Sequence, residues 1–295
     1  MPTTTTSDGV NLYYETHGSA DDPTFLLVNG LGSQMIHYEP EFCSLLVDQG
    51  FHVVRFDNRD VGLSSKTEAP PPNVIALLGT LQSGGAIGAD DVSYRLTDMA
   101  ADAFAVLDAV GAERAHIAGM SMGGMIVQRM TIDRPDRILS MTSIMSTTGN
   151  REVGEATPEA AAVLITPAPA DRDGYIEHSV KTRSIISGSH QDHDDWREVA
   201  GRSFDRMFHP VGVAHQLAAI LADGNRTDQL AALDVPTLVI HGPLDTLIAL
   251  SGGEATAAAI PGAELLVIDE MGHDLPPEIW DEVVTGMAKV AATAD

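Results

Sequence analysis

The sequence predicts an α/β fold in which helices cover both faces of a mostly parallel central sheet. Three observations carry this prediction. Short β-branched or aliphatic runs alternate with longer stretches of helical periodicity along most of the chain. That alternation stops after about residue 146 and resumes at residue 235. The 295 residues, 44% of them apolar, are enough for one sizeable core with an insertion.

Seven runs have the composition of strands. They cover residues 10–16, 24–29, 52–57, 115–119, 139–145, 237–242 and 264–268. The helices expected between them cover residues 39–49, 95–110, 122–132, 253–260 and 277–291. The clearest helix contains Met99, Ala103 and Val106 on one apolar stripe, and Gly111 follows it as a stop signal.

Residues 147–229 contain no convincing core strand. Their short helical stretches cover residues 159–165, 174–186, 194–207 and 213–221. A helical excursion at the carboxyl edge of a parallel sheet lies where ligands bind in such folds. We therefore expect a core of residues 1–146 and 230–295 and a helical lid of residues 147–229. The alternative is an insertion with a structural role only.

The apolar side chains of the expected lid leave two interpretations open. They could line an apolar pocket, or they could form the lid's own core. The residues concerned are Val163, Leu164, Ile165, Ile185, Ile186, Phe204, Met207 and Phe208.

The sequence G-M-S-M-G at residues 119–123 directly follows an expected strand and opens an expected helix. This is the G-x-S-x-G pattern in the strand–turn–helix context that gives it meaning. A serine on so sharp a turn requires small residues two positions before and after it, and Gly119 and Gly123 meet that requirement. The free amides at the start of the helix favour negative charge. The pattern predicts Ser121 as a nucleophile.

A serine nucleophile needs a base, and the eleven histidines must be separated by their positions. His273 lies in the loop after the last expected strand, from which it can reach back over Ser121. His241, at the end of a strand, suits a structural hydrogen bond better, and His116 lies inside a strand and should be buried. We predict His273 as the base.

A carboxylate must orient the imidazole and stabilise its cation. Asp245 lies in the loop after the penultimate expected strand, so the chain order is Ser121, Asp245, His273. Asp274 is the alternative, but a residue adjacent to His273 is poorly placed to accept its ring N–H. We predict Asp245 as the acid.

Two backbone N–H groups should stabilise the oxyanion that forms on the substrate. Met122, which follows the nucleophile, supplies one. The glycine-rich loop N-G-L-G-S at residues 29–33 can turn a second amide inward, and we expect Leu31 to be this donor.

Composition limits the partners and cofactors. The formal net charge of −25 argues against a nucleic-acid or anionic-membrane partner. This acidity fits either adaptation to salt or an ordinary acidic protein. No apolar run approaches the roughly 20 residues of a membrane span, and the polar N-terminus lacks the pattern of a signal peptide, so we expect a cytoplasmic location. Cys43 is the only cysteine, which excludes an intrachain disulfide.

No cofactor or metal is expected. The segment H-Q-D-H-D-D at residues 190–195 looks superficially like a metal cluster. A run of acids before a helix is more simply a cap that complements the helix dipole.

Together these motifs resemble those of the lidded α/β-hydrolases, from residue 10 to the C-terminus. The segment D-N-R-D-V-G-L-S at residues 57–64 is similar to the family's D-x-R-G-x-G-x-S segment. Residues 51–62 and 118–123 are most similar to the aclacinomycin methylesterase group of carboxylesterases. Two residues depart from the family pattern: Asn29 stands where many members have His, and Asp60 where most have Gly. The Asp60 turn must therefore differ or tolerate a strained residue.

The resemblance implies the α/β-hydrolase fold and cleavage of a small, apolar carboxylic ester through an acyl-enzyme. Three alternatives remain open: a carbon–carbon bond hydrolase of vinylogous diketones, a cofactor-free perhydrolase, and a ligand-binding homologue without catalysis. Neither the natural substrate nor the formation of a homo-oligomer follows from the sequence.

Overall fold

The computed structural model describes residues 2–294 and contains an eight-stranded sheet in the order β1-β2-β4-β3-β5-β6-β7-β8. The strands are β1 (Thr3–Thr5), β2 (Asn11–His17), β3 (Thr24–Val28), β4 (His52–Phe56), β5 (Ala115–Met120), β6 (Ile138–Ile144), β7 (Thr237–His241) and β8 (Glu264–Val267). All pairings from β4 to β8 are parallel, and β1 and β2 pair antiparallel at one edge. The predicted α/β class with a mostly parallel sheet is confirmed. The polar strand β1 was not predicted.

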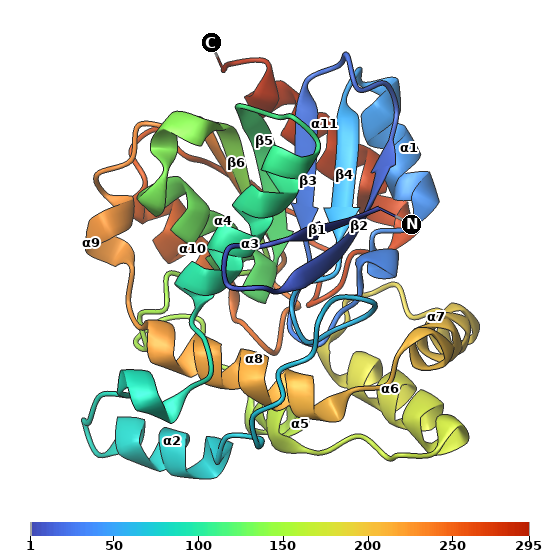
Figure 1. Cartoon of the computed structure of the whole chain (residues 1–295), viewed down its shortest axis with the longest axis vertical. Helices are drawn as coiled ribbons and strands as arrows, with labels where there is room; N and C mark the ends of the chain where they lie inside the picture. The colour runs from blue at the N-terminus through green and yellow to red at the C-terminus, as the bar shows by residue number, and fades with distance from the viewer. Residues whose placement is uncertain (1, 295) are drawn as a thin grey trace.

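Helices cover both faces of the sheet (Figure 1). One face carries α1 (Pro40–Asp48) and α11 (Trp280–Ala291), and the other carries α3 (Leu96–Ala109), α4 (Met122–Asp133) and α10 (Leu250–Ala259). Side chains alternate between the two cores along each strand. In β3, Leu26 and Val28 pack under α3 and α4, whereas Phe25 and Leu27 pack under α1 and α11. A strand buried on both sides explains the uninterrupted apolar runs of the sequence.

Four helices follow β6 and form a layer beyond the carboxyl ends of the parallel strands (Figure 1). They are α5 (Pro158–Ile165), α6 (Arg172–Ile186), α7 (His193–Arg206) and α8 (Pro210–Asp223), and the short α9 (Thr227–Leu230) leads back to β7. A helix that was not predicted, α2 (Val74–Gln82), lies in the same layer. Its Leu77 packs with Ile87 and with Ala218 of α8. No helix within residues 2–294 is long and apolar enough to cross a membrane.

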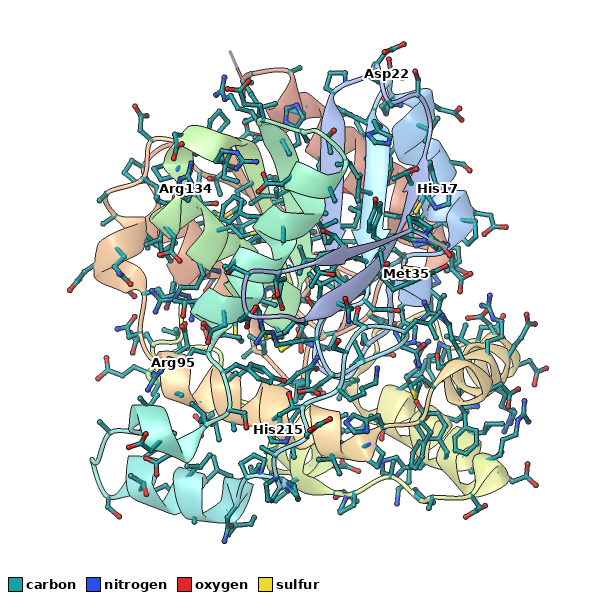
Figure 2. All side chains as sticks on the ribbon, viewed as in Figure 1. His17, Asp22, Met35, Arg95, Arg134 and His215 are labelled. Atoms are coloured by element: carbon teal, nitrogen blue, oxygen red, sulfur yellow. The ribbon has the colours of Figure 1, made fainter. Side chains whose placement is uncertain are left out.

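Polar contacts fix α8 to the segment that precedes α3. The Arg95 guanidinium donates a 2.9 Å hydrogen bond to the Ala222 carbonyl, and Nδ1 of His215 lies 3.2 Å from the Ser93 hydroxyl. Figure 2 shows Arg95 and His215 on the side of this helical layer, whereas Asp22 lies at the opposite end of the molecule. These contacts hold the layer in place over the carboxyl edge of the sheet.

A buried carboxylate joins three segments near the same edge. Asp57, directly after β4, is fully buried and accepts 2.8 Å hydrogen bonds from the backbone N–H groups of Met35 and Leu63. Its Oδ2 also forms a 2.7 Å ion pair with Arg206 of α7. This one side chain therefore links the loop after β3, the turn after β4 and the helical layer.

The Asp60 turn keeps the left-handed backbone of a glycine, with φ at 73°. Asp tolerates this region better than most residues. The buried carboxylate accepts hydrogen bonds from the Thr67 N–H and hydroxyl and from the Tyr94 hydroxyl. Of the two expectations for this turn, the strained residue is the one observed.

Candidate active site

Ser121 lies on the sharp turn between β5 and α4, with φ 55° and ψ −119°. Its N–H donates to the Ile144 carbonyl at 2.9 Å, and the Ser146 hydroxyl donates to the Ser121 carbonyl at 2.8 Å. A Cβ atom at Gly119 would collide with the Gly123 backbone, and one at Gly123 would collide with the carbonyl that ends β3. The steric argument for glycine at both positions is therefore visible in the packing.

The three predicted side chains form one hydrogen-bonded chain. His273 Nε2 lies 2.9 Å from Ser121 Oγ, and His273 Nδ1 lies 2.8 Å from Asp245 Oδ2. An ionised carboxylate can only accept, so Nδ1 carries the proton and Nε2 is left to accept from the Ser121 hydroxyl. This is the tautomer that a general base for serine requires.

The environment of Asp245 keeps its carboxylate charged. Its Oδ1 accepts hydrogen bonds from the backbone N–H groups of Leu247 and Ile248, at 2.9 and 2.8 Å. Burial disfavours the charge, but the neighbouring His273 and the hydrogen bonds from His241, His273 and the Ile248 backbone outweigh it. The pKa of Asp245 is thereby held at about 2.

The alternative histidines and acid have other partners. His241 is fully buried, lies 3.3 Å from Asp245, and donates from Nε2 to the Ile248 carbonyl at 2.7 Å. His116 is buried against the Ser140 hydroxyl, and burial lowers its pKa to about 4. Both match the structural roles expected of them.

The Asp274 carboxylate does not orient the His273 ring. Its Oδ1 accepts 3.1 Å hydrogen bonds from the backbone N–H groups of Gly188 and Gly272. Burial raises the pKa of Asp274, against the effect of these two amides. Asp274 therefore connects the helical layer to the loop of His273.

The two predicted oxyanion donors are free amides on segments that meet at Ser121. Met122 is the first residue of α4, where a backbone N–H has no intrahelical acceptor. The Leu31 N–H has no acceptor within residues 2–294. The preceding Gly30 packs directly on Ser121, since a Cβ atom there would lie 3.2 Å from the Ser121 Cβ.

Asn29, which stands where many family members have His, lies in the same loop as the Leu31 amide. Its carbonyl accepts a 3.0 Å hydrogen bond from Asn58 Nδ2. Its own side-chain amide is fully buried and has no partner within residues 2–294. The polar wall beside Leu31 thus contains an unsatisfied amide.

The sequence did not indicate how closely α6 approaches the loops that carry Asp245 and His273. The His273 N–H donates to the Ile186 carbonyl at 2.7 Å, and the Thr246 hydroxyl donates to the Ile185 carbonyl at 2.8 Å. A Cβ atom at Gly272 would collide with Gly188, so both loops need glycine where they touch. These two glycines are the only sequence feature that marks this contact. In a single sequence they cannot be told apart from other loop glycines.

The acidic segment before α7 is a helix cap, as predicted. Asp192 is the N-cap residue and accepts from the N–H groups of Asp194 and Asp195. His190 instead lies 2.8 Å from Glu270. Within residues 2–294, no group of three or more His, Cys, Asp or Glu side chains is arranged to hold a metal ion.

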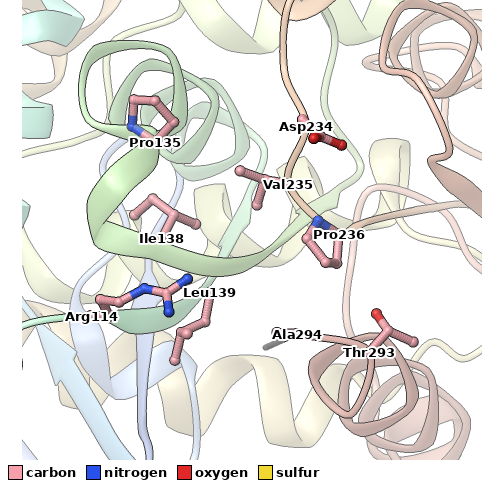
Figure 3. Close-up of a pocket in the computed structure, with 9 residues that line it drawn as sticks. All are labelled: Arg114, Pro135, Ile138, Leu139, Asp234, Val235, Pro236, Thr293 and Ala294. Atoms are coloured by element: carbon pink, nitrogen blue, oxygen red, sulfur yellow. The ribbon is translucent and has the colours of Figure 1, made fainter.

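A pocket of about 330 Å³ lies at the amino-terminal ends of the parallel strands, opposite the end that carries Ser121 (Figure 3). It is lined by Arg114, Pro135, Ile138, Leu139, Asp234, Val235, Pro236, Thr293 and Ala294. Most of these residues precede or begin β5, β6 and β7. None of the predicted site residues lines this pocket.

The sheet, the serine at the strand–helix turn and the loops that carry His273 and Asp245 define an α/β-hydrolase. The family model for the alpha/beta hydrolase fold matches residues 23–278. The chain belongs to this family.

Among curated proteins, the chain is 28% identical to rhodomycin D methylesterase of Streptomyces peucetius, over 97% of each chain. Among solved structures, it is 26% identical to Est816, described as an N-acyl homoserine lactone degrading enzyme, with a TM-score of 0.72 and coverage of 97% of this chain and 99% of that one. The 2-hydroxy-6-oxo-6-phenylhexa-2,4-dienoate hydrolase of Rhodococcus sp. strain RHA1 has a TM-score of 0.76 over 98% of each chain, but at 19% identity it shows the shared fold alone.

Proposed function

We propose that this protein cleaves carboxylic esters through an acyl-enzyme. Ser121 is the nucleophile, His273 the general base and acid, and Asp245 the carboxylate that orients the imidazole. The observation that carries the proposal is the continuous chain from Ser121 Oγ through both ring nitrogens of His273 to Asp245 Oδ2. The methylesterase relative supports an ester substrate.

The first half-reaction forms the acyl-enzyme. His273 Nε2 takes the Ser121 proton while Oγ attacks the ester carbonyl, and Asp245 stabilises the imidazolium that results. The tetrahedral intermediate collapses when the same proton passes from Nε2 to the leaving alcohol oxygen. Water then repeats the sequence, with His273 as its base, and releases the acid and the free Ser121 hydroxyl.

The N–H groups of Leu31 and Met122 stabilise the negative oxygen of both tetrahedral intermediates. Each such donor is worth about 3–4 kcal/mol in the transition state. They are suited to this role because neither has an acceptor among residues 2–294 and both lie on segments that contact Ser121.

We assign substrate selection to a lid made of residues 147–229, with α2 beside it. Loops or domains that cover a site control access more than chemistry. The lid is attached to the catalytic loops through Ile185 and Ile186 and to the core through Arg206. The substrate class that fits the relatives is a small molecule bearing a methyl or other simple ester.

Turnover of a panel of substrates tests the proposal. The panel contains p-nitrophenyl esters of increasing chain length, simple methyl esters and a vinylogous diketone. We expect ester hydrolysis that exceeds diketone cleavage and that is lost in Ser121→Ala. Preferential carbon–carbon cleavage would assign the same triad to the other reaction. Binding of these compounds without any turnover would indicate a non-catalytic homologue.

A further inference from the structure

Arg183, on the lid helix α6, is a cation whose side chain binds no carboxylate directly in the described part of the chain. Its side chain is partly buried, yet it makes no hydrogen bond and no ion pair within 4 Å to any residue in the described range 2–294. Its unpartnered nitrogens are not among the fully buried polar atoms, so they remain open to water. The neighbouring arginines differ, because Arg202 pairs with Glu39 and Arg206 with Asp57.

The acids that influence Arg183 do so from beyond ion-pair distance. They are Asp195, Asp274 and Glu39, and the nearby Tyr175 hydroxyl also favours the charged guanidinium. Glu39 is already bound to Arg202 at 2.7 Å, and Asp274 Oδ1 accepts two backbone N–H groups. Burial lowers the pKa of Arg183 despite these acids. A guanidinium held in partly buried space without a bound carboxylate is costly, and a ligand anion would relieve that cost.

A second polar side chain near Arg183 also has a nitrogen without a hydrogen-bond partner in the described range. His37, in the loop after β3, is partly buried, and its Nε2 is 3.1 Å from the Ser203 hydroxyl. Its Nδ1 has no partner within residues 2–294 and stays open to water. Burial and then the charges of Arg183, Arg202 and Arg206 lower the pKa of His37 to about 3, and Arg183 is the strongest of these charges. The ring is therefore neutral, and it can donate from Nδ1 when Ser203 donates to Nε2.

Both groups belong to segments that touch the catalytic residues. Arg183 lies one helical turn before Ile186, whose carbonyl accepts from the His273 N–H. His37 belongs to the loop whose Gly30 packs on Ser121. Arg183 and His37 therefore lie on two segments, one from the lid and one from the core, that each contact a residue of the predicted triad.

We propose that Arg183, assisted by His37, binds a carboxylate of the substrate remote from the ester that is cleaved. The preferred substrates are then half-esters of dicarboxylic acids. This inference rests on the proposed ester hydrolysis and specifies its substrate class. The planar guanidinium suits a carboxylate, which it can bind through two parallel hydrogen bonds. The acids farther away disfavour a doubly charged group such as phosphate.

The test compares monomethyl and dimethyl esters of succinic, glutaric, adipic and suberic acid, with rates expressed per ester group. We expect one chain length at which the half-ester has a kcat/KM at least about tenfold above that of the diester. A charge-assisted hydrogen bond is worth about 10- to 100-fold, so Arg183→Gln should lose this preference, mainly through a higher KM for the half-ester. Hydrolysis of the diester should be unchanged.

Two further variants control for charge and for folding. Arg183→Lys should retain part of the preference because it keeps the charge but loses the fork of donors. Lys181 is exposed on the same helix, so Lys181→Gln removes one lid charge without touching the proposed site and should change nothing. An equal loss in Lys181→Gln would show a general charge effect and overturn the inference.

A binding measurement tests the carboxylate site independently of ester hydrolysis. Calorimetric titration with the free dicarboxylate of the preferred length should show binding to the wild type, at least about tenfold weaker binding to Arg183→Gln, and weaker binding of the corresponding neutral diamide. Equal affinity for the dicarboxylate and the diamide in the wild type would overturn the site, whether or not Arg183→Gln folds. Dicarboxylate binding without turnover of any ester would contradict the proposed function and leave the carboxylate site supported.

Discussion

Asp245 Oδ2 lies 2.8 Å from His273 Nδ1, although the two residues are 28 positions apart in the chain. Asp274, which directly follows His273, accepts instead from the backbone N–H groups of Gly188 and Gly272. The two carboxylates therefore have different tasks, and they can be separated by substitution.

Asp245→Asn should lower kcat by up to about 10⁴-fold, because an amide cannot hold the imidazole in the required tautomer and cannot stabilise its cation. Asp274→Asn keeps an oxygen that can accept from both glycine amides, and it should lose about tenfold or less. The kcat values are compared after thermal melts have shown that both variants fold. The reverse ranking would mean that the acid is assigned wrongly.

Activity should be lost in acid, because the proposed mechanism requires an unprotonated Nε2 on the base to accept the Ser121 proton. Asp245 does not contribute to this loss, since its pKa of about 2 keeps it ionised over the assay range. The measurement is the profile of kcat/KM against pH, and a two-proton acid limb would contradict it.

Because that pKa lies below the unfolded value near 3.8, Asp245 stabilises the fold above about pH 4 and loses this contribution as the pH falls towards 2.

Chelation should leave activity unchanged. The proposed chemistry uses only side chains and backbone amides, and His190 is already held by Glu270. The assay is ester turnover before and after incubation with EDTA. Complete loss that a divalent ion restores would instead implicate the segment around His190 and His193.

Phe204 and Phe208 should influence substrate choice more than chemistry. Their ring centroids lie 4.9 Å apart, and Tyr175 of α6 packs against both rings. If this cluster borders the acyl pocket, alanine at either position alters KM and chain-length preference with the p-nitrophenyl esters. An unchanged substrate profile together with a lower melting temperature would assign the aromatic cluster to the core of the lid.

The attachment of the lid by Arg206 predicts a difference between two arginine–aspartate pairs. Asp57 is fully buried in its pair with Arg206, whereas Arg172 and Asp205 are both about half exposed. Arg206→Met leaves a buried carboxylate unpaired and should lower the free energy of unfolding by about 2–4 kcal/mol, allowing for the partial exposure of Arg206. Arg172→Met should cost no more than about 1 kcal/mol in the same denaturant titration. Equal costs would contradict the attachment.

The strands of the core and the Ser121 turn could be predicted from the sequence, because each produces a pattern among neighbouring residues. Buried parallel strands appear as apolar runs, and the turn at Ser121 needs glycines at fixed spacing, so periodicity and one motif locate both. Two elements gave no such signal. The three threonines of β1 look like a polar terminus and are ordered by pairing with β2. The helix α2 is apolar around most of its circumference, so it lacks a clear stripe, and its place is set by packing on α8.

The proposed catalytic residues could be named from the sequence, but the contacts around them could not. Chain order and position after strands single out Asp245 and His273 without any knowledge of the lid. The contact of Ile186 with the His273 loop and the isolation of Arg183 depend on how the lid folds back across the chain. No short-range pattern encodes such a contact, because the residues that create it are more than 80 positions apart.

The most direct test of the account is the reaction of the protein with a serine-directed fluorophosphonate, followed by mass spectrometry of its peptides. We expect one adduct, on Ser121, formed at the rate at which ester turnover is lost. Ser121→Ala should fold normally, take up no label and lose roughly 10⁴- to 10⁶-fold in kcat. A label on any other serine, or near-normal turnover by Ser121→Ala, would contradict the assignment of Ser121 as the nucleophile.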